Sequence, residues 1–355
     1  MKNPFIELYR GIAALMVMMC HYAHILYGGE RGWMNFLYTG VDFFFVISGF
    51  VFAPHILGVL QNKSSIYQFF TRRFFRIYPL YLLSVIFYFW FSPNVPQKME
   101  YLINHLGMLH TIHSREEAGF FNLAYWSLPV ELEFYIAVPL LSFLMYKLKS
   151  YFSVTTIIFS WIIIAFSIRC SVALSENVAY KMLGVHLPGM LIEFLIGTMA
   201  FHASRLQRSI KKSILSLLSG LIVLFLLGDF FVRYGDDGIS NSVFLKTSFG
   251  VFCAISYACI LYATVHISVP DHLRTKFESL CQFSGRMSYG LYLFHNLAPM
   301  IFIYLAAFVV VPAIYQYVIN FAFTLLLVFI FNKWYEEPLN IYGKLIAGKI
   351  GGSGK

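Results

Sequence analysis

Four ionisable residues lie in or beside two strongly apolar stretches near the start of the chain. Arg10, His21 and His24 belong to RGIAALMVMMCHYAH, and Asp42 belongs to GVDFFFVISGF. A histidine titrates near neutral pH and can take a proton from a hydroxyl group, while a nearby carboxylate can fix its tautomer. The set predicts general-base catalysis by His21, with Asp42 as the neighbouring carboxylate. Alternatively, His21 bonds a neighbouring helix and Asp42 caps its own helix.

Three arginines follow in TRRFFRIYPLYLL, at the start of the third apolar stretch. Arg72 and Arg76 are four residues apart and share a helix face, with Arg73 beside them. Guanidinium groups bind phosphates in a forked geometry, so this cluster is a candidate site for the anionic end of a nucleotide-like donor. The alternative is a positive anchor for anionic lipid headgroups.

Two later motifs carry further candidates. WSLPVELEFY, residues 126–135, holds two carboxylates only two positions apart, which therefore point to different helix faces. One of the pair is expected to be structural, and the family resemblance described below makes Glu131 the catalytic candidate. SYGLYLFHN, residues 288–296, places His295 deep in an apolar stretch. Four residues are candidate substrate contacts: His24, Trp126, Tyr135 and His295. The alternative is a structural role, for the aromatics at the membrane interface and for the histidines in the core.

The remaining polar positions give weaker predictions. In WYEEPL, Pro338 is expected to end a helix, and Glu336 or Glu337 to bind the inner arginines. No role is assigned to Glu133, Glu193 or Asp229. The five cysteines form neither a CxxC nor a Cys/His cluster, so neither a disulfide framework nor a metal site is expected. Walker, GxGxxG, HExxH and GxSxG motifs are absent from the sequence.

These residues require membrane helices to position them. Of the 355 residues 59% are hydrophobic and only 12% charged, a composition that predicts an all-α, polytopic integral membrane protein. Without a basic polar domain, nucleic acid is excluded as a partner. About ten spans are expected, at 6–28, 38–60, 77–93, 121–146, 152–174, 187–203, 213–232, 243–265, 286–307 and 311–333.

Lys and Arg set the expected orientation. With the N-terminus inside, 18 of the 26 Lys and Arg residues fall on the cytoplasmic side and 7 outside, with Arg10 inside the first span. The positive-inside rule therefore predicts that both termini are cytoplasmic. The first stretch has no small-residue cleavage site and is interpreted as a retained span. Residues 1–345 are expected to form one transmembrane domain, and 346–355, ending in GGSGK, a tail that is partly an added sequence.

Taken in order, the motifs resemble those of the membrane-bound acyltransferase-3 family. The matching pieces are RGIAALMVMMCH, GVDFFFVISGF, RRFFRIYPLYLL, WSLPVELEFY, SYGLYLFH and a late EP pair, and they span nearly the whole chain. The resemblance implies O-acylation of bacterial surface or secreted glycans, with acetyl-CoA as donor, in the cytoplasmic (inner) membrane. Because the chain ends after its last span, it resembles the stand-alone type without a soluble C-terminal domain.

The resemblance also implies roles for single residues. His21 matches the essential histidine, supported by Arg10 and Asp42. Arg73 and Arg76 fall on the RxxR pair, and Glu131 on the glutamate of the WSL motif. His295 matches a late histidine of less defined role. The implied partners are acetyl-CoA, a glycan acceptor and membrane lipids, without a metal.

Two questions stay open at the level of sequence. A secondary transporter or glycan flippase would also bury charged residues, as a proton or substrate path, although no internal repeat is evident. Within the enzyme class, a succinyl or longer acyl donor, a covalent acyl-histidine relay, the acceptor hydroxyl and the oligomeric state are all undecided. Outer aromatics such as Trp33, Tyr38 and the segment 120–126 are candidates for stacking on sugar rings, or are interface anchors.

Overall fold

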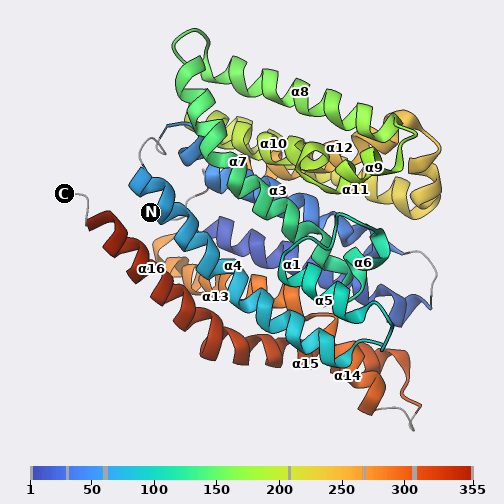
Figure 1. Cartoon of the computed structure of the whole chain (residues 1–355). Coiled ribbons are helices and arrows are strands. Elements are labelled where there is room, and N and C mark those ends of the chain that lie inside the picture. Colours follow the sequence, from blue (N-terminus) through green and yellow to red (C-terminus); the bar gives the residue numbers. More distant parts are fainter. Residues whose placement is uncertain are drawn as a thin grey trace.

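A computed structural model describes residues 3–28, 32–58, 63–206, 209–265, 267, 269–305 and 310–352, and within them every regular element is a helix (Figure 1). The long helices are α1 (Pro4–Tyr27), α3 (Gly40–Ile56), α4 (Lys63–Phe91), α7 (Ser127–Leu148), α8 (Val154–Leu174), α10 (Leu187–Leu206), α11 (Ile210–Ser240), α12 (Val243–Thr264), α13 (Asp271–Phe294), α15 (Ala313–Phe331) and α16 (Glu337–Gly352). The short ones are α2 (Trp33–Phe36), α5 (Lys98–Leu106), α6 (Arg115–Gly119), α9 (Val178–Met182) and α14 (Leu297–Leu305). Short 3₁₀ turns occupy Leu37–Thr39, Leu123–Trp126 and Leu183–Val185, and a π-helical turn occupies Asn332–Glu336.

The helices confirm the predicted all-α, polytopic membrane class. Eight described segments are long and apolar enough to cross a membrane. Helices α1 and α13, where two more spans were predicted, are each 24 residues long and pack against each other within the bundle. The total of ten spans stays a prediction.

Three predicted boundaries differ from the structure. Helix α4 begins at Lys63, so the arginine cluster lies inside a long helix and not at its start. The stretch 286–307 is broken between α13 and α14, with His295 at the break. Pro338 does not end a helix: it stands at the second position of α16, just after the π-helical turn Asn332–Glu336, through which α15 continues into α16. Helix α16 then runs to Gly352, through most of the predicted tail.

The bundle has two halves that meet at α3 (Figure 1). One half contains α8, α10, α11 and α12, and the other contains α1, α4, α13, α15 and α16. Helix α3 packs on α1, α7 and α10, and its phenylalanines contribute to the core clusters of both halves. Helix α3 is apolar around most of its circumference because it packs between helices of both halves.

Two glycines allow α3 and α10 to touch backbone to backbone. A β-carbon at Gly49 would lie within 2 Å of the Phe194 carbonyl oxygen (1.9 Å), and one at Gly197 would lie 2.0 Å from the Val46 carbonyl oxygen. Any side chain at either position would push the helices apart. Small residues make such close contacts between membrane helices.

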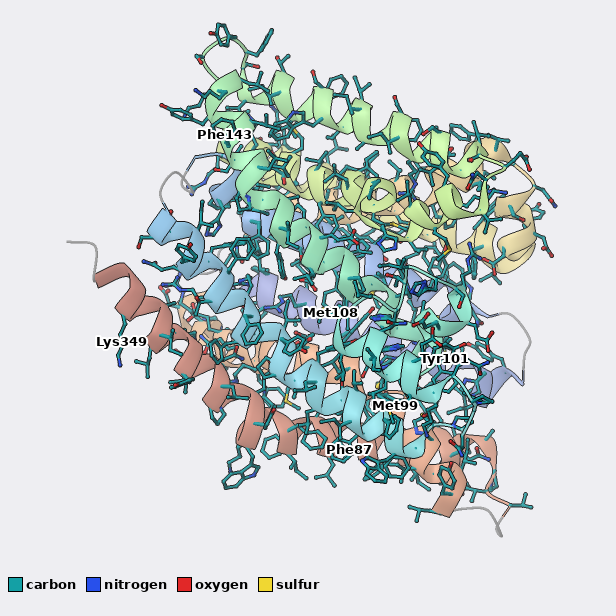
Figure 2. All side chains as sticks on the ribbon, in the orientation of Figure 1. Phe87, Met99, Tyr101, Met108, Phe143 and Lys349 are labelled. Atoms are coloured by element: carbon teal, nitrogen blue, oxygen red, sulfur yellow. The ribbon has the colours of Figure 1, made fainter. Side chains whose placement is uncertain are left out.

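The two ends of the bundle differ in chemistry. The first turns of α1 and the last turns of α10 and α12 gather at one end, together with α16 and the arginines of α4. Lys349 projects there, whereas Met99 and Tyr101 of α5 mark the opposite end (Figure 2). The start of α1 and the end of α16 both lie toward the arginine end (Figure 1). This end is called the basic end below, and the other the α5 end.

Candidate functional site

A cavity of about 620 Å³ enters the bundle from the basic end. Its walls come from α1, α3, α4, α7 and α13 and are mostly apolar. Ser48, Glu131 and Tyr135 are among the polar side chains that face its interior, together with further serines and tyrosines and four arginines. Apolar walls that carry polar groups able to orient a ligand are the usual form of a small-molecule site.

Glu131 is held by hydrogen bonds within this cavity. Ser48 donates its hydroxyl to Glu131 Oε1 over 3.3 Å, and the Tyr135 hydroxyl donates to the same oxygen. Glu131 and Tyr135 are four residues apart on α7, so they share a helix face. Arg10, Arg73 and Arg76 line the same cavity, which brings five predicted site residues together.

Glu133 points to another face of α7 and has a structural role. Its Oε1 lies 2.6 Å from His186 Nδ1, and its Oε2 accepts the backbone N–H of Leu187 over 2.7 Å. Leu187 begins α10, where the first N–H groups have no partner within the helix. Glu133 therefore anchors the start of α10, as the two-residue spacing from Glu131 led us to expect for one of the pair.

The arginines of α4 line a second cavity at the basic end, of about 670 Å³. Arg76 pairs with the buried Glu336 at 3.0 Å, which agrees with the prediction that Glu336 or Glu337 binds an inner arginine. The Arg73 guanidinium lies 5.1 Å from the centre of the Phe52 ring, and Arg72 is exposed. Arg10 is 3.6 Å from Glu7. Two further cations line this cavity, Arg286 and Lys344, which were not among the predicted site residues.

His21 and His295 meet on the other side of the first cavity's wall. His295 Nε2 lies 3.0 Å from His21 Nδ1, and the ring centres are 4.8 Å apart. Tyr292, one turn before His295, lines the cavity, whereas neither histidine does. Phe44 packs edge-on against Tyr292 at 5.5 Å. The histidine pair therefore lies one helical turn beyond the cavity, toward the α5 end.

Backbone carbonyls fix the tautomers of this pair. His295 Nδ1 is 3.1 Å from the Leu291 carbonyl oxygen, and His21 Nδ1 is 2.9 Å from that of Val17. A carbonyl only accepts, so both Nδ1 atoms carry hydrogen. Neutral His295 accepts at Nε2, so the single Nδ1–H of His21 is shared between the Val17 carbonyl oxygen and His295 Nε2. This leaves a lone pair on His21 Nε2, for which the described residues provide no hydrogen-bond partner, and a lone pair there is what a general base requires.

The break between α13 and α14 holds His295 in place. At this break the helical hydrogen bonds lapse, and side chains from other helices take over the free carbonyls. Tyr22 donates to the His295 carbonyl oxygen over 2.6 Å, and Tyr88 and Asn122 donate to that of Leu293 over 3.0 and 2.9 Å. Asn296 is bonded to Asn122 over 2.8 Å. His295 is fully buried within this network.

Asp42 does not accompany His21. A β-carbon at Gly250 would lie 3.0 Å from Arg169 Nη2, 3.6 Å from Asp42 Oδ1 and 3.7 Å from Glu193 Oε1. The Arg169 guanidinium also donates directly to Glu193. Asp42 thus faces a buried ionic cluster between α8, α10 and α12, and His295 takes the place beside His21 where a carboxylate was predicted. The predicted contact between Asp42 and His21 depends on how α1 and α3 are rotated against their neighbours, and sequence spacing does not determine that rotation.

The other candidates lie away from both cavities or only border them. His24 is exposed, and its Nδ1 is 2.5 Å from the His21 carbonyl oxygen. Trp126 is half-buried against Phe45, Trp33 stacks on Phe225, and Tyr38 packs against Phe231. Asp229 pairs with Arg233 on the surface of α11. Among the described residues no cluster of His, Cys, Asp or Glu is suited to hold a metal ion.

A pair of buried histidines lies outside the spans, in the segment between α4 and α7. The His105 and His110 rings stack 4.1 Å apart, near Met108, which has a left-handed φ of 54° (Figure 2). One nitrogen of each ring bonds a carbonyl, and the other has no partner among the described residues. Burial lowers the pKa of His105 to about 3 and that of His110 to about 4.

We expect this segment to lose stability in acid. Both histidines stay neutral when folded but protonate near pH 6.5 when exposed, so stability is lost as pH falls below about 6.5 toward 4. By pH 4.5 the loss is about 2–3 kcal/mol per histidine. Hydrogen exchange of residues 98–122 should accelerate between pH 7 and pH 4.5, after correction for intrinsic exchange. A His105→Phe/His110→Phe variant should lose this dependence, and an unchanged dependence would contradict the assignment.

Comparison with known proteins places the motifs in a wider context. A model of the acyltransferase domain matches residues 3–333. The chain is 28% identical over 351 residues to O-acetyltransferase OatA of Staphylococcus aureus, covering 90% of this chain and 55% of that protein. It is 31% identical over 216 residues to an uncharacterized protein of Haemophilus influenzae, covering 53% and 88%. Acyltransferase MdmB of Streptomyces mycarofaciens is 29% identical over 154 residues, 39% of each chain. No solved structure matches. The chain spans about half the length of the OatA proteins.

Proposed function

Because the chain belongs to the acyltransferase-domain family, we propose that it is a membrane O-acetyltransferase that uses cytoplasmic acetyl-CoA. The acceptor is a hydroxyl of a surface or secreted glycan, or of its lipid-linked precursor, on the outer side of the bacterial inner membrane. The observation that carries this proposal is the pair of cavities at the basic end. The 670 Å³ cavity is lined by cations, and the 620 Å³ cavity leads inward to Glu131 and Tyr135.

The donor fits these cavities by its chemistry. CoA has an anionic nucleotide end, which guanidinium groups bind through charge-assisted hydrogen bonds. Its long, uncharged arm fits the mostly apolar channel that leads to Glu131 and Tyr135. The thioester then comes to lie near Tyr292, one helical turn from His295.

His21 supplies the base. The acceptor hydroxyl gives its proton to His21 Nε2, and its oxygen attacks the thioester carbonyl carbon. The C–S bond breaks, and the CoA thiolate leaves and takes up the proton from the His21 imidazolium. His295 Nε2 accepts the Nδ1–H throughout, which stabilises the imidazolium as the carboxylate does in a catalytic triad. A covalent acyl-His21 relay would use the same Nε2 atom.

Donor binding tests the proposal, and Arg73→Ala is the cleanest variant. Removing Arg76 would strand the buried Glu336, whereas Arg73 has no acidic partner among the described residues. Loss of one charge-assisted contact should weaken acetyl-CoA binding to the detergent-purified protein by about 10- to 150-fold. Arg274→Ala is the control, since Arg274 pairs with Asp271 on α13 and lines neither cavity. Unchanged affinity in Arg73→Ala, or no binding by folded wild type, would refute the donor site.

A further inference from the structure

The two cavities are branches of one vestibule. Five residues line both of them, which places the junction at the first turns of α1 and at the arginines of α4: Asn3, Glu7, Arg10, Arg73 and Arg76. The 620 Å³ branch runs from there between α3 and α7 to Glu131. The 670 Å³ branch runs between α4, α13 and α16. Each volume suits a ligand site.

The branches differ in charge. The α16 branch has six cationic side chains and three acidic ones, and Arg72, Arg286 and Lys344 belong to it alone. Beyond the junction, the α7 branch adds only Arg205 as a cation, at its open rim, and Glu131 as an acid. The α16 branch also carries the amide side chains of Gln282 and Asn340, which can hydrogen-bond a nucleobase.

We propose that the donor binds bent across this junction. Its adenosine diphosphate lies in the α16 branch, with phosphates on Arg286 and Lys344. Its arm turns at Arg10 and Arg73 into the α7 branch. This assignment rests on the proposed function and adds which branch holds the nucleotide.

The fold supports this division. Asn340 and Lys344 are four residues apart on α16, and Arg72 and Arg76 are four apart on α4, so each pair presents one helix face to the branch. The two helices approach closely where Gly343 meets Phe75, whose Cβ lies 2.4 Å from where a β-carbon on residue 343 would stand. The neutral arm, by contrast, gains from the apolar walls of α3, such as Phe44 and Phe45.

A matched pair of variants tests the branch assignment. Arg286, Lys344 and Arg205 are all exposed, so their replacement should leave folding intact, as thermal unfolding will check. The probes are acetyl-CoA, adenosine 3′,5′-bisphosphate and acetyl-pantetheine, each titrated against full-length protein in detergent. For Arg286→Ala/Lys344→Ala we expect at least tenfold weaker binding of the first two probes and unchanged binding of the third. Arg205→Ala should bind all three within about threefold of wild type.

Other outcomes separate failure of this inference from failure of the proposed function. If acetyl-CoA binds wild type, and its affinity falls in Arg205→Ala but not in the double variant, the nucleotide lies in the α7 branch. The bent path is then wrong, while the proposal that acetyl-CoA is the donor remains valid. If the nucleotide fragment fails to bind and phosphatidylglycerol in mixed micelles does, the cations serve lipid and the bent path is also wrong. If wild type binds no acetyl-CoA, both proposals fail.

Discussion

Replacing His21 by alanine should lower acetyl transfer by about 10²- to 10⁴-fold, the contribution of a well-placed general base. The only nitrogen of the pair with a lone pair free for the acceptor is His21 Nε2, because His295 Nε2 is already taken by His21 Nδ1–H. The measurement is incorporation of labelled acetyl groups into the surface glycan of cells that produce the variant at the wild-type level. Acetyl-CoA affinity should be unchanged, because His21 lines neither cavity.

Two further variants separate catalysis from structure. In His21→Asn the amide nitrogen stands where Nδ1 does and can still donate to the Val17 carbonyl, but no base remains; this variant should fold normally and be inactive. His24→Ala, an exposed site one turn away, should keep full activity. Wild-type transfer by His21→Asn would show that His21 is only a structural residue.

The largest effect on stability should come from the buried pair of Arg169 and Glu193. The Glu193 side chain is fully buried and the Arg169 side chain is 14% exposed. Removing one partner of a buried pair leaves an uncompensated charge, so Arg169→Met should lower the free energy of unfolding by about 3–5 kcal/mol. Thermal or denaturant unfolding of the purified protein measures this change.

A second ion pair provides the control. Arg233 and Asp229 are 66% and 37% exposed on α11, so Arg233→Met should cost less than about 1 kcal/mol. Adding Glu193→Leu to Arg169→Met should restore part of the loss, although Asp42 still lacks its cation. Equal effects of Arg169→Met and Arg233→Met would contradict this account of the cluster.

Residue types and local spacing predicted much of the fold and part of the site. The membrane class follows from composition, and the opposite directions of Glu131 and Glu133 follow from their separation of two on one helix. Glu131, Tyr135, Arg10 and Arg73 were all singled out, and the structure brings them to one cavity. Periodicity within a single helix was sufficient for these conclusions.

Contacts between distant helices were not predictable in the same way. Asp42 is close in sequence to His21, yet the tight packing of α3 on α10 and α12 turns it toward Arg169. His295 is 274 positions from His21 and meets it only because α1 packs along α13. Arg286 and Lys344 look like ordinary inner-surface cations until α16 folds back against α4. Hydropathy also placed the start of α4 too late, since its first turns are polar.

The close backbone approach of α3 and α10 at Gly49 and Gly197 bears on whether the two halves can move against each other. Alternating access requires one half of a protein to rock against the other, and α3 joins the halves here. Because no side chain separates the two backbones at these positions, even a small rotation of one helix against the other would open a gap or cause a clash. A fixed arrangement of the halves suits the proposed transfer, in which only the acetyl group would pass from one face to the other while donor and acceptor each stay on their own side.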